Sequence, residues 1–402
     1  MQMRRSAYWL FPWLTVVTLA GGPTVAVADD ADACAKQSGD AAIAACSRAI
    51  ASGQFRGGEL AKVYLSRGVE YKNKNDLDSA IADYSAAIRI DPKSALAYSD
   101  RGNAYAGNGD LDLAMADFES AISIDPKAAH AFNSRGFVEQ TKGDIERAIA
   151  DFGQAISLDP AYAVAYANRG GAYQIKGEND RAIADYDAAI RIDPKYARAY
   201  DSRGSLYGNK GDQDRAMADY DEAIRLDPRL VHAYANRGSV YTDKQDYDHA
   251  LVDLDQAIRL DPEFAQAYYN RGVIYSIKQD YDRAIADYDQ AIRLQPRLSI
   301  ALNNRGLAYL GKNEIDRAVA DYSEAIRLNP GFSAAFNNRG TAFARKNDYA
   351  RAIADYAEAY RLAPGDAAAL FRRGVVRRLA GDKAGGDADI VAAKKINPDL
   401  IE

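Results

Sequence analysis

Residues 265–298 read AQAYYNRGVIYSIKQDYDRAIADYDQAIRLQPRL. Apolar or small residues stand at the fourth, eighth and eleventh positions of this stretch, and again at the twentieth, twenty-fourth and twenty-seventh. Each set marks one face of an amphipathic helix. Gln279-Asp280 separates the two sets, and Pro296 follows the second. The pattern predicts two antiparallel helices, the second of which ends before the proline.

The same unit recurs along the chain, because ten of the twelve prolines lie 34 residues apart. We expect ten copies, without an insertion, at 61–94, 95–128, 129–162, 163–196, 197–230, 231–264, 265–298, 299–332, 333–366 and 367–400. Positions 1 to 34 below are counted from the first residue of each copy. About ten helix-turn-helix units in a row predict an all-α chain.

The turn between the two helices also follows a pattern. Position 15 is Gly or Asn in eight copies, as a left-handed residue that ends a helix requires, whereas Gln245 and Gln279 depart from this pattern. Position 16 is Asp or Glu in all ten copies, which suits the start of the second helix.

Three small positions carry a family resemblance. Position 8 is Gly and position 27 is Ala in every copy, and position 20 is Ala in all but one, where Gly386 stands. Residues 61–400 therefore resemble tandem tetratricopeptide repeats (TPR). The resemblance implies an α-α superhelix, a solenoid that binds proteins or peptides in a concave groove lined by first-helix positions 2, 5, 6, 9, 12 and 13. Departures are the absence of Trp at position 4, Glu139 and Arg377 in place of the aromatic residue at position 11, and Arg where the family has Leu at position 7.

Arg occupies position 7 and Asp occupies position 23 in all ten copies, as in the pairs Arg271 with Asp287 and Arg305 with Asp321. Both positions lie eight residues from the turn, so they stand at the same height in an antiparallel hairpin. We expect a structural ladder of two-pronged ion pairs. Two alternatives remain: the Arg pairs with the position-23 Asp of a neighbouring copy, or it binds an anion.

The first 28 residues have the features of a secretory signal peptide. Arg4 and Arg5 precede an apolar run, and Ala26-Val27-Ala28 supplies the small residues of a cleavage site. Cleavage after Ala28 predicts a periplasmic or secreted protein; the alternative is an uncleaved membrane anchor. The net charge is −6, and loss of two arginines makes the mature chain more acidic, which argues against nucleic-acid binding.

The two cysteines agree with export. Cys34 and Cys46 lie shortly after the expected cleavage point. The pattern around Cys46 is that of a second repeat helix, with Cys46 at the place of a buried aromatic such as Tyr84. We expect residues 29–60 to form two helices that a Cys34–Cys46 disulfide joins into a cap over the first copy. A redox-active or metal-binding pair is the alternative.

We expect no enzyme activity, cofactor or metal. Only 62 residues lie outside the ten copies, whereas a catalytic domain needs about 100. The three histidines, His130, His232 and His249, do not reach metal-ligand spacing within one copy. No phosphate-binding loop or nucleophile–base set is present in the sequence.

Asparagines mark the candidate groove. Position 6 is Asn in five copies, and four of these are consecutive: Asn168, then Asn236, Asn270, Asn304 and Asn338. Position 5 adds Tyr269, Asn303 and Asn337. This row is similar to asparagine ladders in the TPR family, whose amides bind peptide backbone. Tyr269 is predicted to be an exposed aromatic anchor. The alternative is a merely solvated helix face, or local partners for the arginines at position 7.

The predicted function is therefore that of an exported, non-catalytic scaffold or adaptor for protein or peptide partners. The alternative is a structural cell-envelope component associated with the outer membrane or with an envelope assembly machine, attached at its periphery and without an integral membrane segment after cleavage. Four arginines in 371–378 fit either a polar terminal cap or a basic docking point for acidic partners or headgroups.

Overall fold

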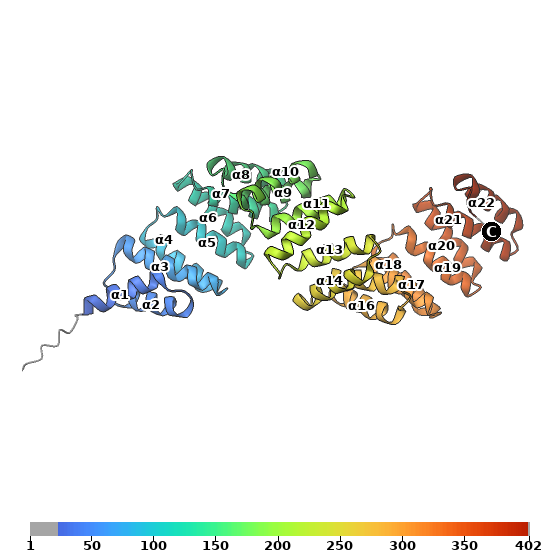
Figure 1. The fold of residues 1–402 in the computed structure, drawn as a ribbon, viewed down its shortest axis with the longest axis horizontal. Helices are drawn as coiled ribbons and strands as arrows, with labels where there is room; N and C mark the ends of the chain where they lie inside the picture. The colour runs from blue at the N-terminus through green and yellow to red at the C-terminus, as the bar shows by residue number, and fades with distance from the viewer. Residues whose placement is uncertain (1–22, 401–402) are drawn as a thin grey trace, which may run out of the picture. The chain divides into compact units, whose positions relative to one another are not determined.

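The computed structural model describes residues 23–400, and this part of the chain forms 22 α-helices and no strand (Figure 1). It divides into two compact units, Met1–Ile192 and Asp193–Glu402. The 34-residue sequence pattern continues through this division. Most of the expected signal peptide lies outside the described residues, and its cleavage point after Ala28 falls within the first described helix.

Two helices precede the expected copies, namely α1 (Pro23–Lys36) and α2 (Gly39–Ala51). The first helices of the copies are α3 (Gly57–Asn73), α5 (Ala95–Asn108), α7 (Ala129–Thr141), α9 (Ala163–Lys176), α11 (Ala197–Asn209), α13 (Val231–Asp243), α15 (Ala265–Ile277), α17 (Ser299–Gly311), α19 (Ser333–Arg345) and α21 (Ala367–Leu379). The second helices are α4 (Leu77–Ile90), α6 (Leu111–Ile124), α8 (Ile145–Leu158), α10 (Asn179–Ile192), α12 (Gln213–Leu226), α14 (Tyr247–Leu260), α16 (Tyr281–Leu294), α18 (Ile315–Leu328), α20 (Tyr349–Leu362) and α22 (Lys383–Ile396).

A left-handed residue ends the turn in every hairpin. Position 15 has a positive φ whether it is Gly, Asn or Gln, and the two departures from the pattern, Gln245 and Gln279, have φ of 62° and 59°. After the turn, Asp280 caps α16 by accepting a hydrogen bond from the Arg283 amide at 3.2 Å. The turn geometry is therefore a property of the hairpin, which two glutamines adopt at some conformational cost.

Small residues let the two helices of a hairpin approach closely. A Cβ atom at Gly272 would lie 2.8 Å from Cε1 of Tyr288, whose side chain is fully buried. Ala284 and Ala291, at positions 20 and 27, are fully buried as well. The core is therefore a row of layers, each made of a buried aromatic or aliphatic residue and the small residues around it.

In the last copy position 20 is Gly386 and not alanine, and α21 and α22 approach each other closely at this residue. A Cβ atom at Gly386 would lie 2.7 Å from the carbonyl oxygen of Gly374, which cannot move aside as a flexible side chain would. We expect Gly386→Ala to destabilise the last hairpin by about 1–3 kcal/mol. Hydrogen exchange of α21 and α22 measures this, with Gly365→Ala, where a Cβ meets nothing within 4 Å, as the control. Equal protection in both variants would contradict the close approach.

First helices lie on the inner side of each stack. In the first unit α3, α5, α7 and α9 contact one another in succession, and in the second unit α11, α13, α15, α17 and α19 do the same. The second helices make no comparable contacts with each other among the described residues. The surface formed by positions 2, 5, 6, 9, 12 and 13 is called the first-helix face below.

Candidate functional site

The arginine at position 7 and the aspartate at position 23 meet across each hairpin. In the second unit, Arg271 donates from Nε and Nη2 to the two carboxylate oxygens of Asp287 at 2.8 and 2.6 Å. Arg305 binds Asp321 in the same way, at 2.8 and 2.7 Å. The two-pronged pair occurs in all ten copies.

The third guanidinium nitrogen reaches the preceding copy. Nη1 of Arg271 donates to Asp255 at 2.6 Å, and Nη1 of Arg305 donates to Asp289 at 2.6 Å. The position-23 aspartate is bound within its own copy, and the aspartate reached in the preceding copy stands at position 25, a contact that the sequence analysis did not predict. Asp287 and Asp255 hold the pKa of Arg271 above its usual value. All three polar nitrogens of Arg271 and Arg305 are engaged, which favours a structural role over anion binding.

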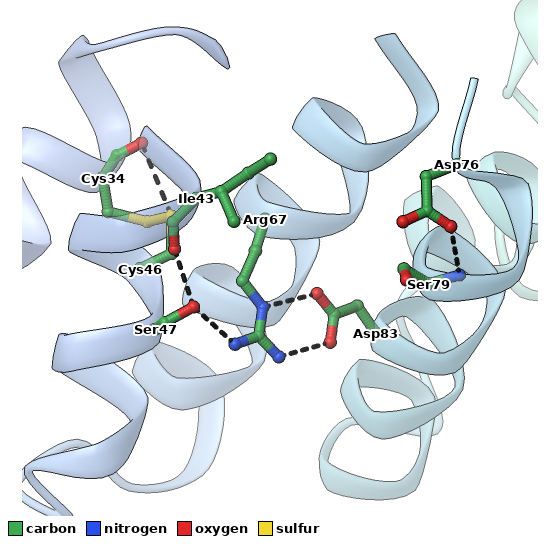
Figure 2. A network of polar contacts seen from close by, with 8 residues as sticks. All are labelled: Cys34, Ile43, Cys46, Ser47, Arg67, Asp76, Ser79 and Asp83. Carbon is green, nitrogen blue, oxygen red and sulfur yellow. Dashed lines mark hydrogen bonds and ion pairs between the residues drawn. A yellow bond between two sulfur atoms is a disulfide. The ribbon is translucent and has the colours of Figure 1, made fainter. Parts of the chain in front are cut away.

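Cys34 and Cys46 form a disulfide between α1 and α2 (Figure 2). Both cysteines are buried, with Ala45, Ala49 and Val63 beside them. The next residue, Ser47, accepts a hydrogen bond from Nη1 of Arg67 at 2.9 Å. In other copies this nitrogen donates to position 25 of the preceding copy, as Arg271 does to Asp255. Arg67 of the first copy donates to Ser47 of α2 instead. The arginine contacts between neighbouring copies therefore extend to α2, which packs against the first copy as the second helix of a preceding copy would.

The candidate groove asparagines form a seam between neighbouring first helices. Four of them donate a hydrogen bond from Nδ2 to position 5 of the preceding copy: Asn168 to Asn133, Asn236 to Asp201, Asn304 to Tyr269 and Asn338 to Asn303, at 2.9, 3.1, 3.2 and 2.9 Å. Asn270 donates to Ser239 at 3.0 Å instead. A carboxamide has two N–H groups and two acceptor lone pairs, so each amide keeps capacity beyond this bond.

The side chains of the three position-5 residues are less accessible to a partner than the sequence suggested. Tyr269 is not a free aromatic anchor, because its half-buried ring packs on the cluster around Tyr288 and its hydroxyl accepts from Asn304. Burial raises the pKa of Tyr269. Asn303 is only 5% exposed, and Oδ1 of Asn337 is buried without a hydrogen-bond partner among the described residues. The side chain of Asn303 therefore acts in the seam.

The first-helix face exposes apolar side chains that were not predicted from the sequence. Among the described residues, thirteen large apolar side chains are exposed. Eight of them stand at first-helix-face positions: Leu96, Phe137, Val164, Ile175, Ile277, Ile300, Leu307 and Leu379. The sequence could have indicated these exposed side chains, because Leu, Ile, Val or Phe stands at positions 2, 9 and 13, which do not belong to the packing positions. Four of these eight side chains lie in the first unit and four in the second.

A pocket of about 190 Å³ opens on the same face between α13 and α15. Its lining residues are Ser239, Thr242, Asp243, Tyr269, Asn270 and Val273. Ser239 and Thr242 are small, so they leave a hollow, and Tyr269 and Val273 form its apolar wall. Asp243 is exposed and places a carboxylate at the pocket.

Comparison with protein families identifies the repeat. Models described as TPR repeat match residues 68–109, 139–177, 171–211, 204–242 and 238–276. Two models described as tetratricopeptide repeat match residues 303–367 and 337–386, and residues 95–128 and 265–298. The chain belongs to the tetratricopeptide repeat family. Comparison with curated proteins gives no match.

Solved structures agree with the TPR fold. The Cut9–Hcn1 hetero-tetramer of the APC/C has 16% sequence identity to this chain and a TM-score of 0.52, over 90% of this chain and 80% of that chain. A TPR protein from Parabacteroides merdae has 20% identity and a TM-score of 0.48, over 62% and 98%. YrrB, described as a TPR protein with an unusual peptide-binding site, has 25% identity and a TM-score of 0.38, over 46% and 95%. The family match and the observed helix pairs make the chain a TPR solenoid, an architecture of protein–protein interaction scaffolds.

The arginines of the last TPR hairpin are mostly paired within it. Arg373 and Arg377 both bind Asp389, at 2.6 and 3.2 Å, and Arg378 binds Asp387 at 2.5 Å. Three of the four arginines therefore serve the hairpin itself, which favours the terminal-cap interpretation over a basic docking point.

A membrane-spanning helix and a metal-ligating cluster are both absent from residues 23–400. No helix within residues 23–400 combines the length and apolarity needed to cross a membrane. Within the same residues, no three His, Cys, Asp or Glu side chains are grouped so that they could hold a metal ion.

Glu139 is a buried carboxyl at position 11, where eight of the other nine copies have an aromatic residue. It is 7% exposed, and its Oε2 has no hydrogen-bond partner among the described residues. Burial, with Asp151 adding to it and Arg135 opposing it, raises the pKa of Glu139 to about 7. The folded chain therefore holds a proton that the unfolded chain releases at lower pH, so this carboxyl lowers stability as pH rises from about 4.5 to 7.

Glu139→Gln is expected to become more stable than the wild type as the pH rises. The amide keeps the shape without the charge, so the difference in free energy of unfolding should grow by about 1–2 kcal/mol between pH 5 and pH 8. Urea unfolding at the two pH values measures it, with the exposed Glu119→Gln as the control. A difference that does not change with pH would show that Glu139 is ionised in the folded chain throughout.

Proposed function

We propose that this chain is a non-catalytic scaffold that holds an extended segment of a partner protein on its first-helix face. The observation that carries the proposal is that each unit exposes four large apolar side chains at first-helix-face positions. In the second unit the α13–α15 pocket and the spare capacity of the asparagine amides lie on the same face. Apolar side chains supply binding energy, and amides hold a peptide backbone without demanding a sequence.

The second helices present a different surface. Their charged side chains neutralise one another in short pairs, such as Arg225 with Glu222 and Arg327 with Glu324, both at 2.6 Å. Lysines at the turns pair with aspartates of the preceding copy, as Lys278 does with Asp248 at 2.9 Å. A surface of self-paired charges suits solvent contact. This contrast favours the first-helix face as the binding surface.

Export to the periplasm or outside the cell is part of the proposal. The features at residues 1–28 support it, and so does the Cys34–Cys46 disulfide, because such bonds persist in oxidising compartments. Attachment to the cell envelope has no comparable support, since the arginines of the last hairpin are mostly paired internally.

Two matched substitutions test the proposed surface. Leu307→Asp places a charge on the first-helix face, and Val252→Asp places the same charge on α14; both wild-type side chains are exposed, at 43% and 66%. We expect Leu307→Asp to reduce the amount of partner protein co-purified from the native cells at least about tenfold, and Val252→Asp to leave it unchanged. Circular dichroism confirms folding. Full capture by Leu307→Asp, or loss with Val252→Asp alone, would contradict the proposal.

A further inference from the structure

The α13–α15 pocket differs from the equivalent place one copy further along the face. Position 13 is Asp243 at the pocket but the exposed Ile277 one copy on, and position 9 changes from Ser239 to Val273 and then to the exposed Leu307. A small polar site with a carboxylate thus stands beside a larger apolar one. The two neighbouring sites differ in the side chain that each can accept.

The charge at the pocket is negative. Asp243 makes no ion pair among residues 23–400, whereas the adjacent Lys244 is bound to Asp214 at 2.8 Å. None of the six lining residues is basic. A carboxylate without an internal partner attracts a cation and repels an acidic segment.

The walls of the pocket suit a long cationic side chain. Tyr269 and Val273 offer apolar surface to a methylene stem while the charged end reaches Asp243 at the exposed rim. Asn270 is held in place by Ser239, to which it donates at 3.0 Å, and by Gln266, from which it accepts at 2.7 Å. Its second N–H is left for a carbonyl of a bound backbone.

We propose that the α13–α15 pocket receives a lysine or arginine side chain of the partner segment, and that Ile277 and Leu307 receive a large apolar side chain about three residues away. Packed helices are about 10 Å apart and an extended chain advances about 3.3 Å per residue, which sets this spacing. The inference rests on the proposed function, because it assumes an extended segment on the first-helix face.

Selection of random twelve-residue peptides, displayed on phage, against the whole chain tests the inference. We expect enrichment of sequences with Lys or Arg separated by about three residues from Leu, Ile, Met or Phe. Asp243→Asn should weaken a selected peptide about three- to fivefold. Glu263→Gln makes the same change in net charge at an exposed residue of the loop before α15 and should leave binding unchanged. Replacing the basic residue of that peptide by Gln should weaken the wild type but not Asp243→Asn.

The outcomes separate the two proposals. Peptides that lack a basic residue but lose binding with Leu307→Asp would overturn the assignment of the pocket and leave the proposed surface standing. Peptides insensitive to both Leu307→Asp and Asp243→Asn would overturn both proposals, and so would a selection that enriches no sequence. Equal weakening of peptide binding by Asp243→Asn and Glu263→Gln would show that only the net charge matters and would overturn the inference.

Discussion

Arg271→Ala is expected to destabilise the second unit by about 3–5 kcal/mol, because it leaves a buried carboxylate without its partner. Asp287 is 5% exposed and receives two of its hydrogen bonds from this guanidinium. Asp255, in the preceding copy, loses its bond to Nη1 as well. The loss therefore weakens both the hairpin and the contact between neighbouring copies. Chemical denaturation followed by circular dichroism measures it.

A double-mutant cycle isolates the contribution of the pair. Arg271→Ala with Asp287→Ala should cost less than the two single changes together, since no unpaired charge remains buried. Arg293→Ala is the matched control, because Arg293 is exposed and, within residues 23–400, donates a hydrogen bond to Gln290 alone; it should cost less than about 0.5 kcal/mol. Strict additivity of the two single changes would show that the two-pronged pair is not formed in solution.

Removal of the disulfide should destabilise the N-terminal end of the first unit by about 3 kcal/mol. Cys34 and Cys46 close a short loop, and opening it restores conformational freedom to the unfolded chain. Cys34→Ala with Cys46→Ala should raise the rate of hydrogen exchange in α2 and leave α8 unaffected. Thiol labelling of denatured, oxidised wild type should find no free thiol. Two reactive thiols per chain would contradict the bond.

Local patterns in the sequence predicted the hairpins, and the reasons are physical. Small residues at positions 8, 20 and 27 and a left-handed residue at position 15 leave few alternatives to a close helix pair. The same patterns do not specify contacts between copies. Whether Arg271 binds Asp287, Asp255 or both depends on the offset between neighbouring hairpins, and the structure shows both.

The candidate site was harder to predict for the same reason. Position 5 appeared to face outward on an isolated helix, but Asn303 is buried and accepts a hydrogen bond from the neighbouring first helix, and the half-buried Tyr269 packs on Tyr288. The pocket exists because Ser239 and Thr242 of one copy lie opposite Tyr269 and Val273 of the next. Such a hollow arises only when two copies are placed side by side. The division into two units likewise has no counterpart in the repeat pattern.

Photo-cross-linking in the native cells tests most directly whether partners bind the first-helix face. A photoreactive amino acid replaces Leu307 on that face or Val252 on α14, both of which are exposed in the free chain. We expect cross-linked partner protein from position 307 and none above background from position 252, with the two chains equally abundant. Cross-links from position 252 alone, or equally from both positions, would contradict it.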